Sequence, residues 1–276
     1  MPHRMMGFAI VLFWVIATSW LVWHDIVPVW TAQDPPKVVA SNWVRRHGEK
    51  VQFGVYDESG RWIGGIWTEY SSATSTDRED EIYFDDLPVL GPACVHVKSI
   101  FDVDGRLDEI DISVLGAWDP VRIHGERFPS QFAFKIDAGA FQQTFKIDLD
   151  LAGMFSATFR PFDAMPELSV GQAWRMQVFN PIAAVTGIGD KFIPMLVSVV
   201  GREVIRIDGR LRDCFIVQAS GVKAWVERSS GVVLHQEITL PIGGTITVRY
   251  ERYDDDARRR AAKRFESHQL AGGPRL

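Results

Sequence analysis

Hydrophobic and polar residues alternate along most of the chain, in short runs that turn residues separate. From about residue 50 onward, runs such as VQFGVYD and RWIGGIWTEY flank turn signals such as ESG. These signals recur about every 8 to 12 residues, a spacing typical of antiparallel strands and not of alternating strands and helices. The pattern therefore predicts a mainly β protein.

The C-terminal half repeats this pattern more clearly. Tight turns at IDGR, SG, RSSG and PIGG separate five predicted strands, which are residues 196–206, 211–218, 222–227, 232–240 and 245–253. Short turns of this composition join neighbouring antiparallel strands. Two arrangements fit the whole set of strands: one continuous curved sheet, or two sheets.

The N-terminus differs from the rest of the chain. Residues 7–23 (GFAIVLFWVIATSWLVW) carry no charge and lie at the short end of what spans ~30 Å of hydrocarbon. Trp23, Pro28 and Trp30 follow where a cleavable signal peptide needs small residues, so a retained anchor is predicted. The alternative is a buried core helix, or removal of the segment by cleavage.

The few charges beside this segment predict its orientation. Arg4 precedes it, while Asp25 and Asp34 follow it. The positive-inside rule then places the N-terminus in the cytoplasm. We expect a single-pass protein of the cytoplasmic (inner) membrane, whose body lies in the periplasm or the extracellular space.

The chain ends in a predicted helix. Asp254–Asp256 precede ARRRAAKRF, so acids lie at the positive end of the helix dipole and bases toward the other end. A solvated surface helix is expected, and contact with anionic lipid is the alternative. The chain therefore divides into an anchor, a linker, two antiparallel β regions and a C-terminal helix with its tail: 1–30, 31–48, 49–160, 161–253 and 254–276.

Charge and cysteine content exclude some classes of function. The net charge of -5 and the pI of about 5.8 argue against a nucleic-acid partner, which usually requires a basic stripe. Cys94 and Cys214 are far apart and lie in strand-like runs, which favours two buried thiols, with a disulfide as the alternative.

The stretch WVERSSGVVLHQE contains Glu227, His235 and Glu237, the first candidates for catalysis. If RSSG is a four-residue loop, Trp225 lies opposite Leu234, and Glu227 points away from His235. His235 and Glu237 share a face, but with Cβ atoms ~6 to 7 Å apart and no nucleophile beside them. A β-hairpin packed through Trp225 and Leu234 is predicted.

Two acidic stretches resemble metal sites. DVDGRLDE (102–109) has its glycine two residues too early for a calcium loop, and Ser113 stands where the twelfth-position Glu belongs. A two-residue turn is predicted there. DREDEIYFDD (77–86) holds six carboxylates and is expected to form a solvated loop or a weak cation site. No catalytic residue, metal site or cofactor is predicted.

A family resemblance rests on the segments LSVGQAW, GREVIRIDGRLRDCFIVQ, AWVERSSGVVLHQE and PIGGTITVRYE, within residues 168–253. They resemble an uncharacterised domain of exported bacterial proteins, also seen ahead of transglutaminase-like domains. By architecture that domain is similar to the curved half-barrels of periplasmic lipoprotein carriers of the Lol type, which hold acyl chains. The resemblance implies a half-barrel-like sheet and assigns no catalytic residue.

These observations lead to a functional hypothesis. We expect a non-enzymatic, membrane-anchored binding protein that holds a lipid, an acyl chain or a partner protein on a curved sheet. Residues 7–23 would contact the membrane, and an extracytoplasmic hydrolase or a subunit of an envelope export complex are the alternatives. Six aromatic residues are expected to line the apolar concavity: Trp62, Trp67, Phe134, Phe145, Trp174 and Trp225.

Overall fold

The computed structural model describes residues 12–20, 50–72, 76–87, 91–102, 107–116, 120–139, 141–148, 165, 167–179, 192–240 and 244–271. Within these ranges the protein is mainly β, as the alternation predicted. Fourteen strands form one antiparallel sheet in the order β8-β7-β6-β5-β4-β3-β2-β1-β14-β13-β12-β11-β10-β9. The strands therefore belong to one continuous open sheet and not to two.

The strands of the sheet fall into two consecutive groups. The first comprises β1 (Lys50–Tyr56), β2 (Trp62–Ser72), β3 (Thr76–Leu87), β4 (Gly91–Phe101), β5 (Leu107–Leu115), β6 (Val121–Phe128), β7 (Gln131–Ala138) and β8 (Phe141–Asp148). The second comprises β9 (Ala173–Phe179), β10 (Phe192–Ile207), β11 (Arg210–Ala219), β12 (Val222–Glu227), β13 (Val233–Thr239) and β14 (Thr245–Glu251). In each group, consecutive strands pair with one another, and β1 pairs with β14 to join the groups.

Residue type explains the tight turns. Asp208 and Gly209 between β10 and β11 have φ angles of 49° and 75°. Positive φ at both central residues is the geometry of a type I′ turn, which matches the right-handed twist of the flanking strands. The five strands predicted in the C-terminal half are confirmed as β10–β14.

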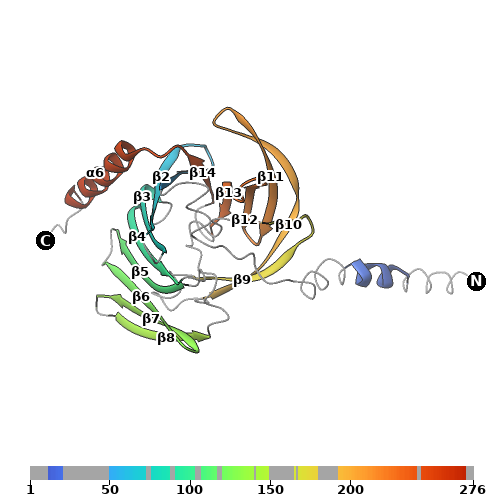
Figure 1. Ribbon diagram of the computed structural model, residues 1–276, viewed down its shortest axis with the longest axis horizontal. Coiled ribbons are helices and arrows are strands. Elements are labelled where there is room, and N and C mark those ends of the chain that lie inside the picture. Colours follow the sequence, from blue (N-terminus) through green and yellow to red (C-terminus); the bar gives the residue numbers. More distant parts are fainter. Residues whose placement is uncertain are drawn as a thin grey trace, which may run out of the picture.

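The sheet curves strongly, so that it has a concave and a convex face (Figure 1). Alternation along each strand sends one set of side chains to each face. Phe53, Ile66 and Ile82 lie opposite one another on the concave side of β1, β2 and β3. Almost all buried apolar residues of the protein form one cluster that includes these three.

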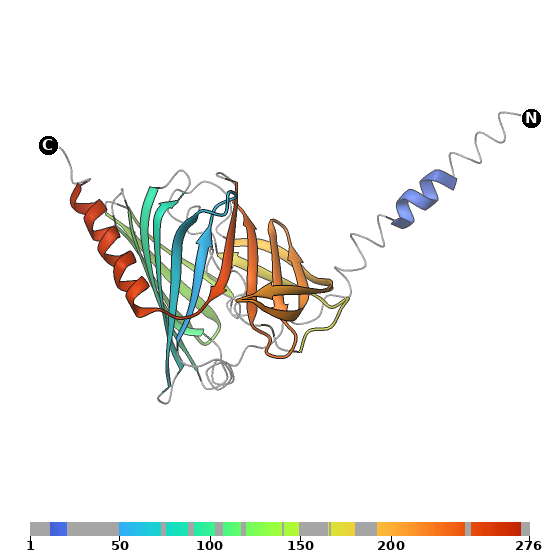
Figure 2. The same ribbon diagram turned by 90° about the horizontal axis from the view of Figure 1, so that it is seen from above.

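Helix α6 (Asp255–Ala271) packs against the convex face over β2, β3 and β4 (Figure 2), and confirms the predicted C-terminal helix. The Asp254 carboxylate caps it, accepting hydrogen bonds from the backbone N–H groups of Asp256 and Ala257 at 2.8 and 3.1 Å. Ala261 and Phe265 are buried in a second, smaller cluster with Trp67, Tyr83 and Cys94. The helix is thus docked on the sheet along one side.

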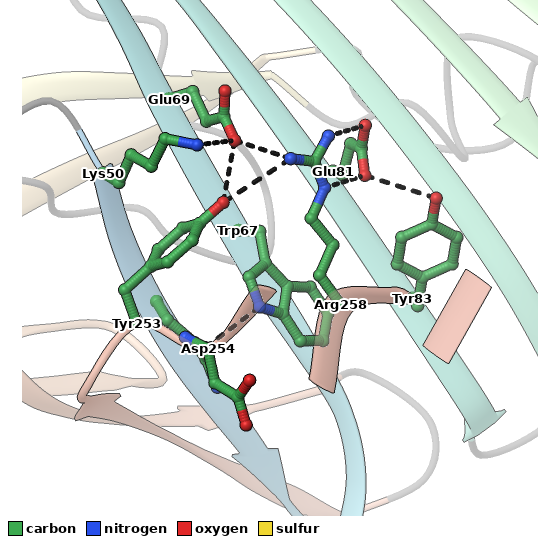
Figure 3. Close-up of polar contacts among 9 residues, drawn as sticks. Lys50, Trp67, Glu69, Glu81, Tyr83, Tyr253, Asp254 and Arg258 are labelled. Carbon is green, nitrogen blue, oxygen red and sulfur yellow. Dashed lines mark hydrogen bonds and ion pairs between the residues drawn. The ribbon is translucent and has the colours of Figure 1, made fainter. Parts of the chain in front are cut away.

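Polar contacts fix the first turns of α6 on the sheet (Figure 3). The Arg258 guanidinium bonds Glu81 Oε2 at 2.7 Å through Nε and Glu69 Oε1 at 2.5 Å through Nη1. Tyr253 also donates to Glu69 at 2.7 Å. These charge-assisted bonds hold the start of the helix against β2 and β3.

The predicted membrane anchor lies only partly within the described residues. Residues 12–20 are helical, and the remainder of 7–23 is not among the described ranges. None of the helices within the described ranges combines the length and the apolar character that a membrane crossing requires.

Candidate functional site

The concave face of β4–β8 is lined by rows of apolar side chains. Ile112, Ile123 and Ile136 lie opposite one another on β5, β6 and β7, and Val114 and Val121 begin the next row. Because cross-strand neighbours on one face are the contacts that stabilise a sheet, these rows make a continuous apolar surface.

Three phenylalanines extend this surface to the edge of the sheet. The ring centroids of Phe132 and Phe134 are 4.9 Å apart, and Phe134 stacks on Phe145 of β8 at 5.1 Å with an interplanar angle of 14°. Gly125 of β6 makes room for them, since a Cβ there would lie 2.6 Å from the Phe132 ring and 2.8 Å from the Phe134 ring. The aromatic layer therefore depends on a glycine in the neighbouring strand.

Part of this surface remains accessible to solvent. Ile123, Phe132, Phe134 and Ile136 are buried. Around them lie apolar residues that pack against the core but are only half-buried: Phe101, Ile112, Val114, Phe145 and Ile147. We name these five residues the open apolar patch. An apolar patch on a concave surface can take up a hydrophobic molecule.

A buried charged group lies on the same face, in β2 and β3. Arg78 Nε is 2.8 Å from Asp80 Oδ2, and Thr68 donates a hydrogen bond to the same carboxylate. Burial opposes the charge of Arg78, but the Asp80 carboxylate outweighs it, and the pKa of the guanidinium is raised. The Arg78 guanidinium thus stays charged next to the apolar rows.

The six aromatic residues predicted to line the concavity are divided between the two faces. Phe134, Phe145 and Trp174 belong to the large cluster and lie on the concave side of β7, β8 and β9. Trp62 and Trp67 lie instead in the convex-side cluster under α6, and the Arg264 guanidinium is 5.0 Å from the Trp62 ring centroid. The alternation placed these tryptophans in strands but could not show which face a terminal helix would cover.

Trp225, the sixth residue, also belongs to the large cluster, but it lies on the convex side of β12, in one row with His235 and Arg249. Its indole N–H donates to Glu203 Oε2 at 2.8 Å, and the Lys223 ammonium is 4.3 Å from the ring centroid. The His235 ring stands edge-on to it, with centroids 4.7 Å apart. Trp225 is therefore shielded by polar side chains and does not face the concave surface.

The predicted register of the 225–237 hairpin holds at the turn, where the Glu227 N–H donates to the Val232 carbonyl at 2.7 Å, but it is wrong beyond that pair. Trp225 pairs with His235 and not with Leu234, because a β-bulge lies between the pairs Trp225–His235 and Val226–Val233. One extra residue in a strand shifts the partner of every residue beyond it. The hairpin itself forms as predicted.

Glu227, His235 and Glu237 are not assembled as a catalytic set. Glu227 bonds Arg212 at 2.8 Å and Ser230 at 2.5 Å, while His235 Nε2 is 3.6 Å from Glu237 Oε1. Burial lowers the pKa of His235 despite the nearby Glu237 carboxylate, so the neutral imidazole is favoured.

The prediction of a solvated loop at 77–86 is wrong, because this acidic stretch forms most of strand β3. Alternation divides its carboxylates between the faces: Asp80 is buried beside Arg78, whereas Glu81 reaches Arg258 on the convex side. Asp85 pairs with Arg264 at 2.9 Å. These acids are thus distributed among basic partners. The predicted turn at 102–109 lies largely outside the described residues.

Cys94 and Cys214 are both free thiols and both buried, so the alternative of a disulfide is not realised. Burial raises the pKa of each thiol to about 12. A thiol that stays protonated at neutral pH is a poor nucleophile, which makes both residues structural.

The convex face of β3–β6 carries a groove of about 370 Å³. Charged side chains of both signs line it, among them Glu79, Glu81, His96, Lys98, Arg122 and His124. The sequence analysis did not identify this groove, because its residues come from four strands and meet only through the strand register.

Comparison with known proteins adds a distant structural neighbour. No family model matches the chain, and no curated protein matches it either. The neighbour is a crystal structure from Brucella abortus, described as a "Beta-barrel-like Protein of Domain of Unknown Function DUF1849". The similarity covers 74% of this chain and 97% of the chain in that structure, with 10% sequence identity and a TM-score of 0.43.

Proposed function

We propose that the protein binds an apolar ligand, a lipid or an acyl chain, on the concave face of β4–β8. One observation carries this proposal: the open apolar patch is half-buried and continuous with the buried core. Each square ångström of apolar surface removed from water is worth about 25 cal/mol, so a chain laid on this patch gains affinity from burial alone.

The nature of the surface favours binding over catalysis. The side chains of the open apolar patch are hydrocarbon, and polar groups on the same face include Arg127, in the row of Phe132 and Ile147, and the Arg78–Asp80 pair. Such a surface selects ligands by shape and apolar area.

We further propose that residues 7–23 anchor the protein in the cytoplasmic membrane with its body on the outer side. The uncharged run and the charges beside it support this orientation. An anchored binding protein would take up its ligand close to the bilayer.

An acyl-chain probe tests the binding proposal. Full-length protein in mild detergent is titrated with parinaric acid, whose fluorescence rises in an apolar environment. We expect saturable binding, which the double substitution Phe145→Gln with Ile147→Gln weakens about tenfold by removing apolar contact area.

A matched control separates this surface from general hydrophobicity. Leu211 on β11 is apolar and 66% exposed, and it lies outside the open apolar patch. Leu211→Gln should leave the affinity unchanged. Equal losses in both variants, or no saturable binding by the unmodified protein, would overturn the proposal.

Deletion tests the anchor separately. Washing membranes at alkaline pH should leave the full chain in the membrane fraction and release a variant lacking residues 7–23. Equal release of both forms would show that this segment does not anchor the protein.

A further inference from the structure

Four potential metal ligands lie in a square on the convex face of β5 and β6. Asp111 of β5 stands opposite His124 of β6, and Glu109 stands opposite Glu126. Residues two apart on a strand share a face, so all four side chains project from the same side of the sheet. Asp111 and His124 also line the convex groove.

Three of these residues bring their donor atoms together. His124 Nδ1 is 2.8 Å from Asp111 Oδ1. One donor atom each of Glu109, Asp111 and His124 lies within 4.8 Å of the other two. Ligands around a tetrahedral ion with bonds of about 2.1 Å are about 3.4 Å apart, so small side-chain rotations would close the set around one ion.

The local charge independently favours a cation. Glu109 and Glu126 are like charges directly opposite each other, an arrangement that destabilises a sheet. Their next neighbours in the same row are Ile100 on β4 and Ala133 on β7, and neither can compensate the charge. Lys98 and Lys135 flank the adjacent Asp111–His124 row instead.

We propose that Glu109, Asp111 and His124 form a binding site for a divalent transition-metal ion of the Zn²⁺ class. An imidazole with two carboxylates matches the preferences of Zn²⁺ and its neighbours, whereas Ca²⁺ and Mg²⁺ take oxygen ligands throughout. Glu126 adds negative charge beside the site. Asp111 and His124 are about half exposed, so water completes the coordination sphere.

The site does not depend on the proposed apolar ligand, because it lies on the opposite face of the sheet. Tag-free full-length protein is titrated with ZnCl₂ against a chromogenic chelator. We expect uptake of one ion per chain. His124→Ala should weaken it at least about tenfold, since even partners that only orient a ligand have effects of this size.

His96 provides the matched control. It is also an exposed histidine of the convex groove, but it stands opposite Ser113 and Glu81 and does not belong to the set. His96→Ala should leave Zn²⁺ affinity within about twofold of the original, and Glu126→Gln should weaken it less than His124→Ala does.

Ring resonances test the site in the unmodified protein, where no substitution affects folding. Zn²⁺ should shift or broaden the ring signals of His124 and leave those of His96 in place. The proposal is overturned if the protein takes up no stoichiometric Zn²⁺, if His124→Ala binds as tightly as the unmodified chain, or if His96 responds equally.

Discussion

The two groups of strands bury their concave faces to different extents. In β10–β14, Val197, Val217, Ala224 and Val248 have no exposed surface at all. In β4–β8, Ile136 is buried equally, but Ile112 and Val114 remain half-buried. Both groups follow the same alternation, so the pattern of residue types alone does not account for the difference.

The convex faces show the opposite contrast. Helix α6 covers β2–β4, where Trp67, Tyr83 and Phe265 bury further apolar surface. On the convex face of β12, Trp225 contacts the polar side chains of Glu203 and Lys223. Apolar burial on the convex face is thus concentrated at β2–β4, beside the strands that carry most of the open apolar patch. Three pairs of substitutions test the comparison of the two groups, in order of decreasing expected effect.

Introducing a carboxylate on the concave face of each group of strands measures the difference in burial most directly. Val217→Asp places a carboxylate where the side chain has no exposed surface, and should cost about 4 kcal/mol or more of unfolding free energy. Val114→Asp, in the open apolar patch, should cost less than about 2 kcal/mol because water reaches that position. Urea unfolding followed by circular dichroism gives both values, and equal costs would contradict the comparison.

Gly125→Ala tests whether the aromatic layer supports the open half. The added methyl group meets the rings of Phe132 and Phe134, and should cost about 1–3 kcal/mol. Gly201→Ala is its control, because a Cβ at Gly201 meets no atom within 4 Å, and we expect a change within about 0.5 kcal/mol. Similar unfolding midpoints for the two variants would show that the layer can rearrange freely.

Arg258→Ala removes the polar attachment of α6 and should cost about 1 kcal/mol, since its charges are partly exposed. Faster amide hydrogen exchange in α6 would report the loss. Arg260→Ala is the control, because Arg260 is 61% exposed and only approaches Asp254 at 3.4 Å. Equal exchange in the two variants would show that Arg258 does not attach the helix.

The same substitution has a predicted pH dependence. Burial alone would raise the pKa of Glu81, but its hydrogen bonds to Arg258 outweigh burial and lower that pKa from the usual 4.5. A carboxyl group with a lowered pKa in the folded state stabilises it above pH 4.5, and this stabilisation is lost as the pH falls through the folded-state value. The cost of Arg258→Ala should therefore be smaller at pH 3 than at pH 7.

The sequence predicted strands well because alternation and turn residues act locally. Asp208 and Gly209 mark their turn by composition alone. The partner of Trp225 was predicted one residue too early, since a bulge depends on how the flanking strands twist and leaves no mark in the alternation. The aromatic residues were assigned to strands correctly, but the face of Trp62 and Trp67 depends on where α6 docks.

The stretch 77–86 shows a second limit of the sequence. Its six carboxylates suit a solvated loop by composition. Every second residue nevertheless faces the core, and Asp80 is accommodated there by Arg78 two positions earlier. The Glu109–Asp111–His124 set was missed for a related reason, because Asp111 and His124 meet only through the β5–β6 register.

The pairing of β1 with β14 has a consequence for the order of folding. Within each group, strands pair with their neighbours in the chain, so both meanders can form while synthesis proceeds. Gln52, in contrast, pairs with Glu251 near the end of the described chain. The ribosome must release the chain as far as β14 before β1 and β14 can pair. Until then, β1 and β14 present unpaired edges, and the newly made protein is most prone to aggregate through these two strands.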